Sequence, residues 1–164
     1  MSSSKPCIFY DGSRYEMGES IGHQLFGLMT MFRREVESRM AKHGLTDAQW
    51  KPLWLLKAGR ASTAIELARE MDVDAGAVTR MVDRLEAKGM IERLRSDEDR
   101  RVVHLSLTKA GDVTAAEVPH VLAAVNNDFL RGFSEAEWKQ LRKLLGRVAA
   151  NGAALQAESA AEET

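Results

Sequence analysis

The stretch that decides the fold lies in the middle of the chain and reads DAGAVTRMVDRLEAKGMIERLRSDEDRRVVHLSL (residues 74–107). Up to Gly89, apolar residues recur every three or four positions, which predicts an amphipathic helix capped by Asp74 and stopped by Gly89. From Met90 the apolar period changes to two, which predicts strands over residues 91–95 and 102–107 with a polar hairpin tip between them. A helix followed directly by a hairpin is therefore expected here.

A shorter helix is expected just before this stretch. Thr63 and Glu66 have the spacing of a capping box, and the helical pattern continues to Met71. Residues 72–74 then make a tight connection to the next helix. Two short helices joined by a tight turn and followed by a charged hairpin have the order of a winged helix-turn-helix. The sequence thus predicts a mainly α fold with a small β-hairpin wing.

Longer helical tracts are expected on both sides of this unit. Apolar spacing and cap residues predict helices from Ile21 to near Gly44, from Thr46 to about Leu56 with Pro52 inside it, from Thr108 to about Gly132, and from Ser134 to Gln156. The last of these keeps an apolar seam that includes Trp138, Leu145 and Leu155. Such a seam favours pairing with another helix.

Composition places the chain among ordinary globular proteins. It has 164 residues, of which 45% are apolar and 29% charged. A single cysteine, Cys7, cannot close an internal disulfide. No apolar run approaches the ~20 residues of a membrane span, and residues 1–5 lack the apolar region of a signal peptide. We therefore expect a cytoplasmic protein with no membrane partner.

The charge balance sets a condition on any binding of nucleic acid. With 23 basic and 24 acidic residues, the bulk field is too weak to hold a polyanion, so contact with DNA requires a local basic surface. A major groove about 12 Å wide accepts one helix whose inserted face carries small and hydrogen-bonding groups. The candidate DNA-binding residues are Gly76, Thr79, Arg80 and Arg84 on one helix face, and Arg95, Arg100 and Arg101 around the hairpin tip. The plain alternative is a solvated surface, since such residues are common on exposed helices.

Four elements of the sequence have an order and spacing that resemble those of a known family. They are VTRMVDRLE (residues 78–86), Lys88-Gly89, Asp99-Arg100-Arg101 and LTKAG (residues 107–111). Over about residues 18–156 the chain is similar to the MarR-type (multiple antibiotic resistance) transcriptional regulators. The resemblance implies a homodimer that binds a pseudo-palindromic operator in double-stranded DNA. It also implies that Asp99 braces the wing by pairing with an arginine, and that a small ligand binds where the parts of the dimer meet.

The same resemblance suggests how the chain is divided. Residues 1–19 would form an N-terminal arm, and residues 46–107 the winged helix-turn-helix domain that binds DNA. Residues 20–45 and 108–156 would form a helical dimerisation region. Residues 157–164, which are rich in alanine and glutamate, are expected to be a flexible tail.

Ligand candidates come from the arm and from the first two helices. They are Arg14, Tyr15, His23, Trp50 and Trp54. The two tryptophans lie one helical turn apart, and an aromatic wall beside a polar or cationic group would suit an aromatic carboxylate or a phenol. Structural roles are the alternative, because a tryptophan pair at this spacing is more often part of the core and a lone helix histidine is more often simply hydrogen-bonded.

These observations predict a repressor that a small aromatic effector releases from its operator. Two alternatives stay open: a peroxide- or thiol-sensing regulator that acts through Cys7, and a DNA-binding module without a ligand. An enzyme is not expected, because the chain has no phosphate-binding glycine loop or nucleophile elbow. The four histidines, His23, His43, His104 and His120, have no metal-ligand spacing, so neither a metal nor a cofactor is predicted.

Overall fold

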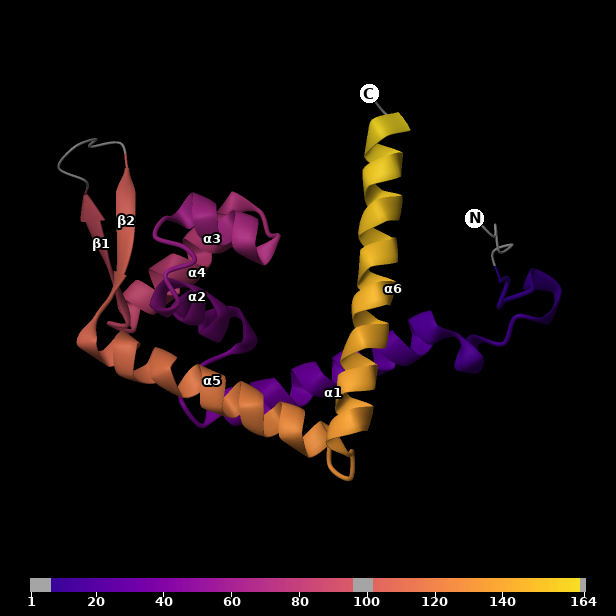
Figure 1. The fold of residues 1–164 in the computed structure, drawn as a ribbon. Helices are drawn as coiled ribbons and strands as arrows, with labels where there is room; N and C mark the ends of the chain where they lie inside the picture. Colours follow the sequence, from indigo (N-terminus) through magenta and orange to yellow (C-terminus); the bar gives the residue numbers. More distant parts are fainter. Residues whose placement is uncertain (1–6, 96–101, 163–164) are drawn as a thin grey trace. The chain divides into compact units, whose positions relative to one another are not determined.

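The computed structural model describes residues 7–95 and 102–162, and these form a mainly helical fold with one two-stranded sheet (Figure 1). The elements follow in the order η1 (Gly12–Arg14), η2 (Met17–Glu19), α1 (Ile21–Ala41), α2 (Asp47–Lys57), α3 (Ala64–Met71), α4 (Ala75–Ala87), β1 (Ile91–Arg95), β2 (Val103–Leu107), α5 (Lys109–Phe129) and α6 (Glu135–Glu162), where η marks a short 3₁₀ helix. The predicted class, mainly α with a hairpin after two short helices, is confirmed.

The structure divides into two compact units, Met1–Val125 and Asn126–Thr164. The first unit holds the arm, α1 to α4, the hairpin and most of α5, and the second holds the end of α5 and α6. Within the first unit, α2, α3 and α4 gather beside the hairpin (Figure 1). The predicted grouping of residues 20–45 with 108–156 concerns a dimer and stays a prediction.

One apolar core joins the three short helices to the hairpin. Leu53 of α2, Leu67 of α3, Leu85 of α4 and Ile91 of β1 are all buried. Their spacing along each helix follows the apolar periodicity of the sequence, so each helix turns one stripe inward and leaves the opposite face to solvent. Burial of these side chains is the main force that holds the helices and the hairpin together.

The turn between α3 and α4 depends on two aspartates. Asp72, with φ of 53°, adopts the left-handed conformation that ends α3. Aspartate tolerates this conformation better than most residues because its short side chain can hydrogen-bond locally. Asp74 then caps α4, since its Oδ1 accepts a hydrogen bond from the Ala77 N–H at 2.8 Å. The tight connection expected from the sequence therefore sets the start of α4.

The hairpin is antiparallel and lies against the segment that precedes α3. Ile91 pairs with Leu107 at its base and Arg95 with Val103 at its far end. The Leu105 N–H donates to the carbonyl of Ser62 at 2.7 Å, and Thr63 forms a bridge with His104. Strand β2 thus continues the sheet onto the residues that begin the helix-turn-helix, and this attachment positions the hairpin as a wing.

A close backbone contact joins the hairpin to α5. The Thr108 N–H donates to the Met90 carbonyl at 3.1 Å, and the Thr108 hydroxyl donates to the Gly89 carbonyl at 2.6 Å. Gly111 is buried against the same turn, and a Cβ atom added to it would lie 1.8 Å from the Met90 carbonyl oxygen. Only glycine fits at this position. The glycine of the LTKAG motif is therefore required because it packs against the turn that follows Lys88-Gly89.

Helix ends are where the structure and the sequence expectations differ most. Helix α5 ends at Phe129 rather than near Gly132, and α6 continues to Glu162 instead of stopping at Gln156. The added residues of α6 are mainly alanine and glutamate, which have high helix propensity, so the helix extends without a buried face. Pro52 and Pro119 both lie inside helices that continue past them. Over the described residues, no helix is long and apolar enough to cross a membrane.

Candidate nucleic-acid interface

Helix α4 carries the predicted polar face on its exposed side. Gly76, Thr79, Arg80 and Arg84 are all exposed, whereas Val78, Met81, Val82 and Leu85 are buried on the opposite side. The structure therefore brings four of the predicted DNA-binding residues together on one surface. Within residues 7–95 and 102–162, neither Arg80 nor Arg84 makes an ion pair, so both guanidinium groups are available for another partner.

The start of this face is shaped by Gly76. A Cβ atom added there would lie 3.0 Å from Oδ1 of Asp74 and 3.5 Å from Nη1 of Arg80. Glycine thus leaves room for the capping carboxylate on one side and for the arginine on the other. The uncovered amide groups and the positive end of the helix dipole favour an anion near this point.

Acidic residues on α4 are held by an arginine of the wing. Nη2 of Arg93 lies 2.5 Å from Oδ1 of Asp83, and its Nη1 bonds to Oε2 of Glu86. The hydrogen bond to Asp83 and the nearby charge of Glu86 raise the pKa of the Arg93 guanidinium above its usual value. This arginine neutralises carboxylates that would otherwise repel phosphate groups, and it ties β1 to α4.

Sequence reasoning missed Arg93 and Glu86. The available signal was local: Asp83 and Glu86 stand three residues apart on one helix face, and a strand containing an arginine follows the helix after a single turn. Which arginine of that strand reaches the pair depends on how the hairpin folds back. Arg93 does so, whereas Arg95 at the end of β1 is exposed.

The tip of the wing lies outside the described residues. Asp99, Arg100 and Arg101, predicted to brace the wing and to contact DNA, fall within this tip. Arg95, the last residue of β1, is the described residue at its entrance. The roles of Asp99, Arg100 and Arg101 therefore remain predictions.

Trp50 and Trp54, the aromatic ligand candidates, lie together at a cavity between α2 and α3. Its volume is about 220 Å³, and it is lined by Trp50, Lys51, Trp54, Leu55, Arg60, Glu70 and Met71. Trp50 is mostly buried and its indole N–H donates to Asp47 at 3.2 Å, while Trp54 is half-buried. Each tryptophan therefore packs against neighbours and also faces the cavity.

The other ligand candidates lie apart from this cavity. Arg14, Tyr15 and His23 are exposed and are not among its lining residues. The Tyr15 ring packs against Tyr10, whose hydroxyl accepts a hydrogen bond from the Ile21 N–H at 3.0 Å. The arm is thus held at the start of α1, and Cys7 beyond it is exposed. In the described part of the chain, no three His, Cys, Asp or Glu residues meet as metal ligands.

Comparison with known proteins connects this geometry to transcription regulators. Residues 45–103 match the model of the MarR family. A curated relative, the HTH-type transcriptional repressor MdtR of Bacillus subtilis (strain 168), is 36% identical over 125 residues, which are 76% of this chain and 81% of that protein.

Two similar solved structures contain DNA. A mutant MarR from E. coli complexed with operator DNA has a TM-score of 0.69 and 28% identity, covering 78% of this chain and 92% of that one. The transcriptional repressor CouR bound to a 23-mer DNA duplex has a TM-score of 0.71 and 26% identity, covering 81% of this chain and 94% of that one. The region matched by the family model includes α2 to α4 and β1.

Proposed function

This chain belongs to the MarR family of DNA-binding transcriptional regulators, and on that basis we propose that it is a repressor released from its operator by a small aromatic ligand. One observation carries the DNA-binding part of this proposal. The exposed face of α4 presents Arg80 and Arg84, while Arg93 holds the acidic residues Asp83 and Glu86 of the same helix. The surface therefore offers cations and hydrogen-bond donors while its carboxylates are neutralised.

Groove geometry supports α4 as the helix that reads DNA. Its exposed face begins at Gly76, where the backbone can approach a phosphate group closely, and continues through Thr79 to the two arginines. An arginine can bond to O6 and N7 of guanine with two parallel hydrogen bonds, or to a phosphate group. Arg95 and the tip residues Arg100 and Arg101 would then reach the neighbouring minor groove.

A homodimer is part of the proposal. Single chains leave large apolar side chains of α1 in solvent, such as Phe26 at 73% and Met29 at 65% exposure. On α6, seam residues Leu145, Val148 and Leu155 are also exposed. Large apolar side chains left exposed on a helix are typical of an interface between proteins. Two copies would also present two α4 helices to the two half-sites of a palindrome. The arginines of both helices would then contact one DNA molecule, although the net charge of each chain is only −1.

Sedimentation equilibrium tests the dimer. We expect a species of twice the chain mass of 18.2 kDa at micromolar concentration. A stable monomer under these conditions would contradict the proposed assembly.

A cytoplasmic location is also part of the proposal, because the proposed partner is DNA.

Ligand release follows the arithmetic of linked equilibria. A ligand shifts the population only by its differential affinity for the two states, and a 100-fold preference for the DNA-free state corresponds to about 2.7 kcal/mol. The cavity beside Trp50 and Trp54 supports an aromatic ligand. The relative MdtR is a transcriptional repressor, which supports repression rather than activation as the role of this chain.

Selection from random-sequence duplexes, followed by fluorescence anisotropy on the selected site, tests the proposed function. We expect a two-fold symmetric site and an affinity whose logarithm falls linearly with the logarithm of salt concentration. Benzoates and phenols are then added to the complex, and at least one should release the DNA. If the protein binds no duplex more tightly than random sequence, the proposed function as a transcriptional regulator is refuted. If it binds DNA selectively but no compound weakens the complex, a DNA-binding module without a ligand is favoured.

A further inference from the structure

Lys88, the residue that ends α4, contacts the joint between α1 and α2. We call residues 42–49 the α1–α2 joint. The Lys88 Nζ donates to the Gly44 carbonyl at 2.9 Å and to Oε1 of Gln49 at 2.8 Å. Gly44 belongs to the turn after α1, and Gln49 lies in the first turn of α2. One side chain at the C-terminal end of α4 therefore contacts both the end of one helix and the start of another.

The two oxygens that accept from Lys88 are held in place by other contacts of the joint. Gly44, with φ of 71°, has the left-handed conformation that turns the chain after α1, and the next residue, Leu45, is buried. The Thr46 N–H donates to Oε1 of Gln49 at 3.2 Å as part of the capping box of α2. Because these contacts do not involve the lysine, the joint offers Lys88 a fixed position.

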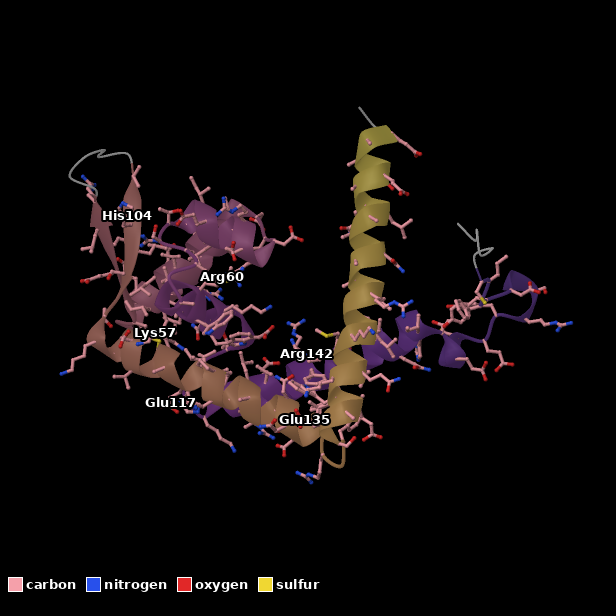
Figure 2. All side chains as sticks on the ribbon, viewed as in Figure 1. Lys57, Arg60, His104, Glu117, Glu135 and Arg142 are labelled. Atoms are coloured by element: carbon pink, nitrogen blue, oxygen red, sulfur yellow. The ribbon has the colours of Figure 1, made fainter. Side chains whose placement is uncertain are left out.

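Helix α2 is also tied to the neighbouring long helices at both ends. At its start, Oδ2 of Asp47 lies 2.9 Å from Nε of Arg33 on α1. At its end, Nζ of Lys57, which Figure 2 labels, lies 2.6 Å from Oδ1 of Asp112 on α5. The joint therefore moves together with α1 and α2, and the Lys88 contact fixes the end of α4 relative to both helices.

The chemistry of the contact suits a role in orientation more than in folding. Both partners of Lys88 are neutral oxygens, to which a charged donor forms a stronger hydrogen bond than a neutral donor. Loss of the lysine would leave no buried oxygen unpaired, because Gln49 keeps its bond to the Thr46 N–H and Gly44 is exposed. Removal of the ammonium should therefore change where α4 points without unfolding the chain.

We propose that Lys88 is a positioning residue for operator binding, which fixes α4 relative to α1 and thereby sets the separation of the two α4 helices in a dimer. The inference rests on the proposed function, in which α1 pairs with a second copy and α4 enters the major groove. The position of α4 relative to α1 in each chain then determines how far apart the two α4 helices lie. That separation must match the spacing of the half-sites. Lys88 needs no contact with DNA for this role, because it acts through Gly44 and Gln49.

Half-site spacing measures this role. Fluorescence anisotropy compares the site selected from random duplexes with versions that have one base pair more or one base pair fewer at the centre. Lys88→Met keeps nearly the length of the side chain and removes its donors. It should weaken binding to the selected site about 2- to 30-fold, the range for residues that couple two parts of a protein. It should also reduce the discrimination against the two altered spacings, while thermal unfolding changes little.

Salt dependence separates positioning from direct contact with DNA. A lysine that binds a phosphate group contributes about one unit to the slope of log affinity against log salt concentration. Lys88→Met should leave this slope unchanged, because its ammonium is bound to the protein. A slope that falls by about one unit per subunit, with the spacing preference intact, would assign Lys88 to the phosphate backbone and overturn the proposal.

Lys42→Met is the matched control, because it removes the same charge from an exposed position of the same joint. It should leave affinity and spacing preference unchanged, and an equal loss in this variant would overturn the proposal. Lys88→Arg, which keeps the charge and the donors, should retain most of the spacing preference. If Lys88→Met does not fold, Lys88→Gln gives the same test. Wild-type affinity and spacing preference in a folded Lys88→Met or Lys88→Gln would also overturn the proposal.

Failure of this inference and failure of the proposed function give different results. A protein that selects no duplex fails as a regulator. A protein that selects a symmetric site, but whose spacing preference does not depend on Lys88, remains a regulator in which other contacts position α4.

Discussion

The Arg93 guanidinium of β1 lies 2.5 Å from the Asp83 carboxylate of α4 and also bonds to Glu86 one turn further along the same helix. A basic residue of the wing is thereby bound to the helix next to it. The interaction neutralises the acidic part of the α4 surface and fixes the wing relative to that helix. Arg93 is thus a positioning residue, distinct from the exposed Arg80 and Arg84.

Arg93→Gln should weaken operator binding although the Arg93 guanidinium is already paired with Asp83 and Glu86. The change leaves Asp83 and Glu86 uncompensated beside the phosphate backbone, and it frees β1 from α4. Restoring charge balance with Asp83→Asn in the Arg93→Gln background should recover part of the affinity. Anisotropy on all four proteins of this double-mutant cycle should give a coupling energy of about 0.5–3 kcal/mol. Additive effects would mean that the ion pair has no role in DNA binding.

Arg80→Ala and Arg84→Ala should each weaken operator binding by about 1–3 kcal/mol if the side chain reads a base. Both residues are exposed on α4, so thermal unfolding should change little. The control is Arg147→Ala, which removes the same charge from the exposed surface of α6. Wild-type affinity in both α4 variants would exclude this helix from the groove.

Gly111→Ala should destabilise the protein by at least about 1–3 kcal/mol, the usual cost of forcing atoms into a filled space. The added Cβ would lie 1.8 Å from the Met90 carbonyl oxygen, so the start of α5 must move away from the hairpin. Gly152→Ala is the matched control, because nothing lies within 4 Å of its Cβ position. In the interior of α6 that change should stabilise by about 0.5–1 kcal/mol. Urea unfolding measures both, and a neutral Gly111→Ala would contradict the close approach of the two segments.

The wing tip allows a test by sign. Arg100→Ala or Arg101→Ala should lower operator affinity and reduce the steepness of its salt dependence, by about one unit of slope for each phosphate group that a subunit no longer binds. Asp99→Ala should also weaken binding if Asp99 braces the wing, although removal of a negative charge alone would strengthen it. Tighter binding by Asp99→Ala would therefore show that this carboxylate only repels DNA.

Acid should weaken the start of α3 through Glu66. This carboxylate accepts hydrogen bonds from the Ser62 N–H at 2.6 Å, the Ser62 hydroxyl at 2.9 Å and the Thr63 N–H at 3.1 Å. The Ser62 bonds, the backbone one first, hold the pKa of Glu66 below its usual value. A lowered pKa means that the stabilisation is present at neutral pH and disappears as the pH falls below about 4.3.

Glu66→Gln should therefore reduce the loss of stability between neutral and acidic pH, because its side chain does not ionise. Thermal unfolding over this range compares the variant with the wild type. Ser62→Ala, which removes one of the donors to the carboxylate, should reduce the loss to a smaller degree. Identical pH profiles for all three proteins would rule out a contribution from this cap.

Short-range signals in the sequence were sufficient for the helices and the hairpin. Thr63, Glu66 and Asp74 form hydrogen bonds with residues three or four positions away, and the change of apolar period at Met90 marks the start of the hairpin. Such features depend on neighbours along the chain, so they could be predicted without knowledge of packing. The exposed face of α4 followed in the same way, because the buried stripe of a helix determines its opposite side.

Tertiary structure alone decided which distant residues meet. Arg93 rather than Arg95 reaches Asp83, because Arg93 lies in the middle of β1 and Arg95 at its far end. Arg60 and Glu70 line the same cavity as the two tryptophans because α3 packs beside α2. The apolar pattern within either helix does not encode how the two helices pack. Gly111 is required by a carbonyl oxygen that is 21 residues away in sequence, at Met90. The sequence by itself determined the elements and their exposed faces through local hydrogen bonds and periodicity, while pairs between elements depend on packing angles that are set only when the whole core forms.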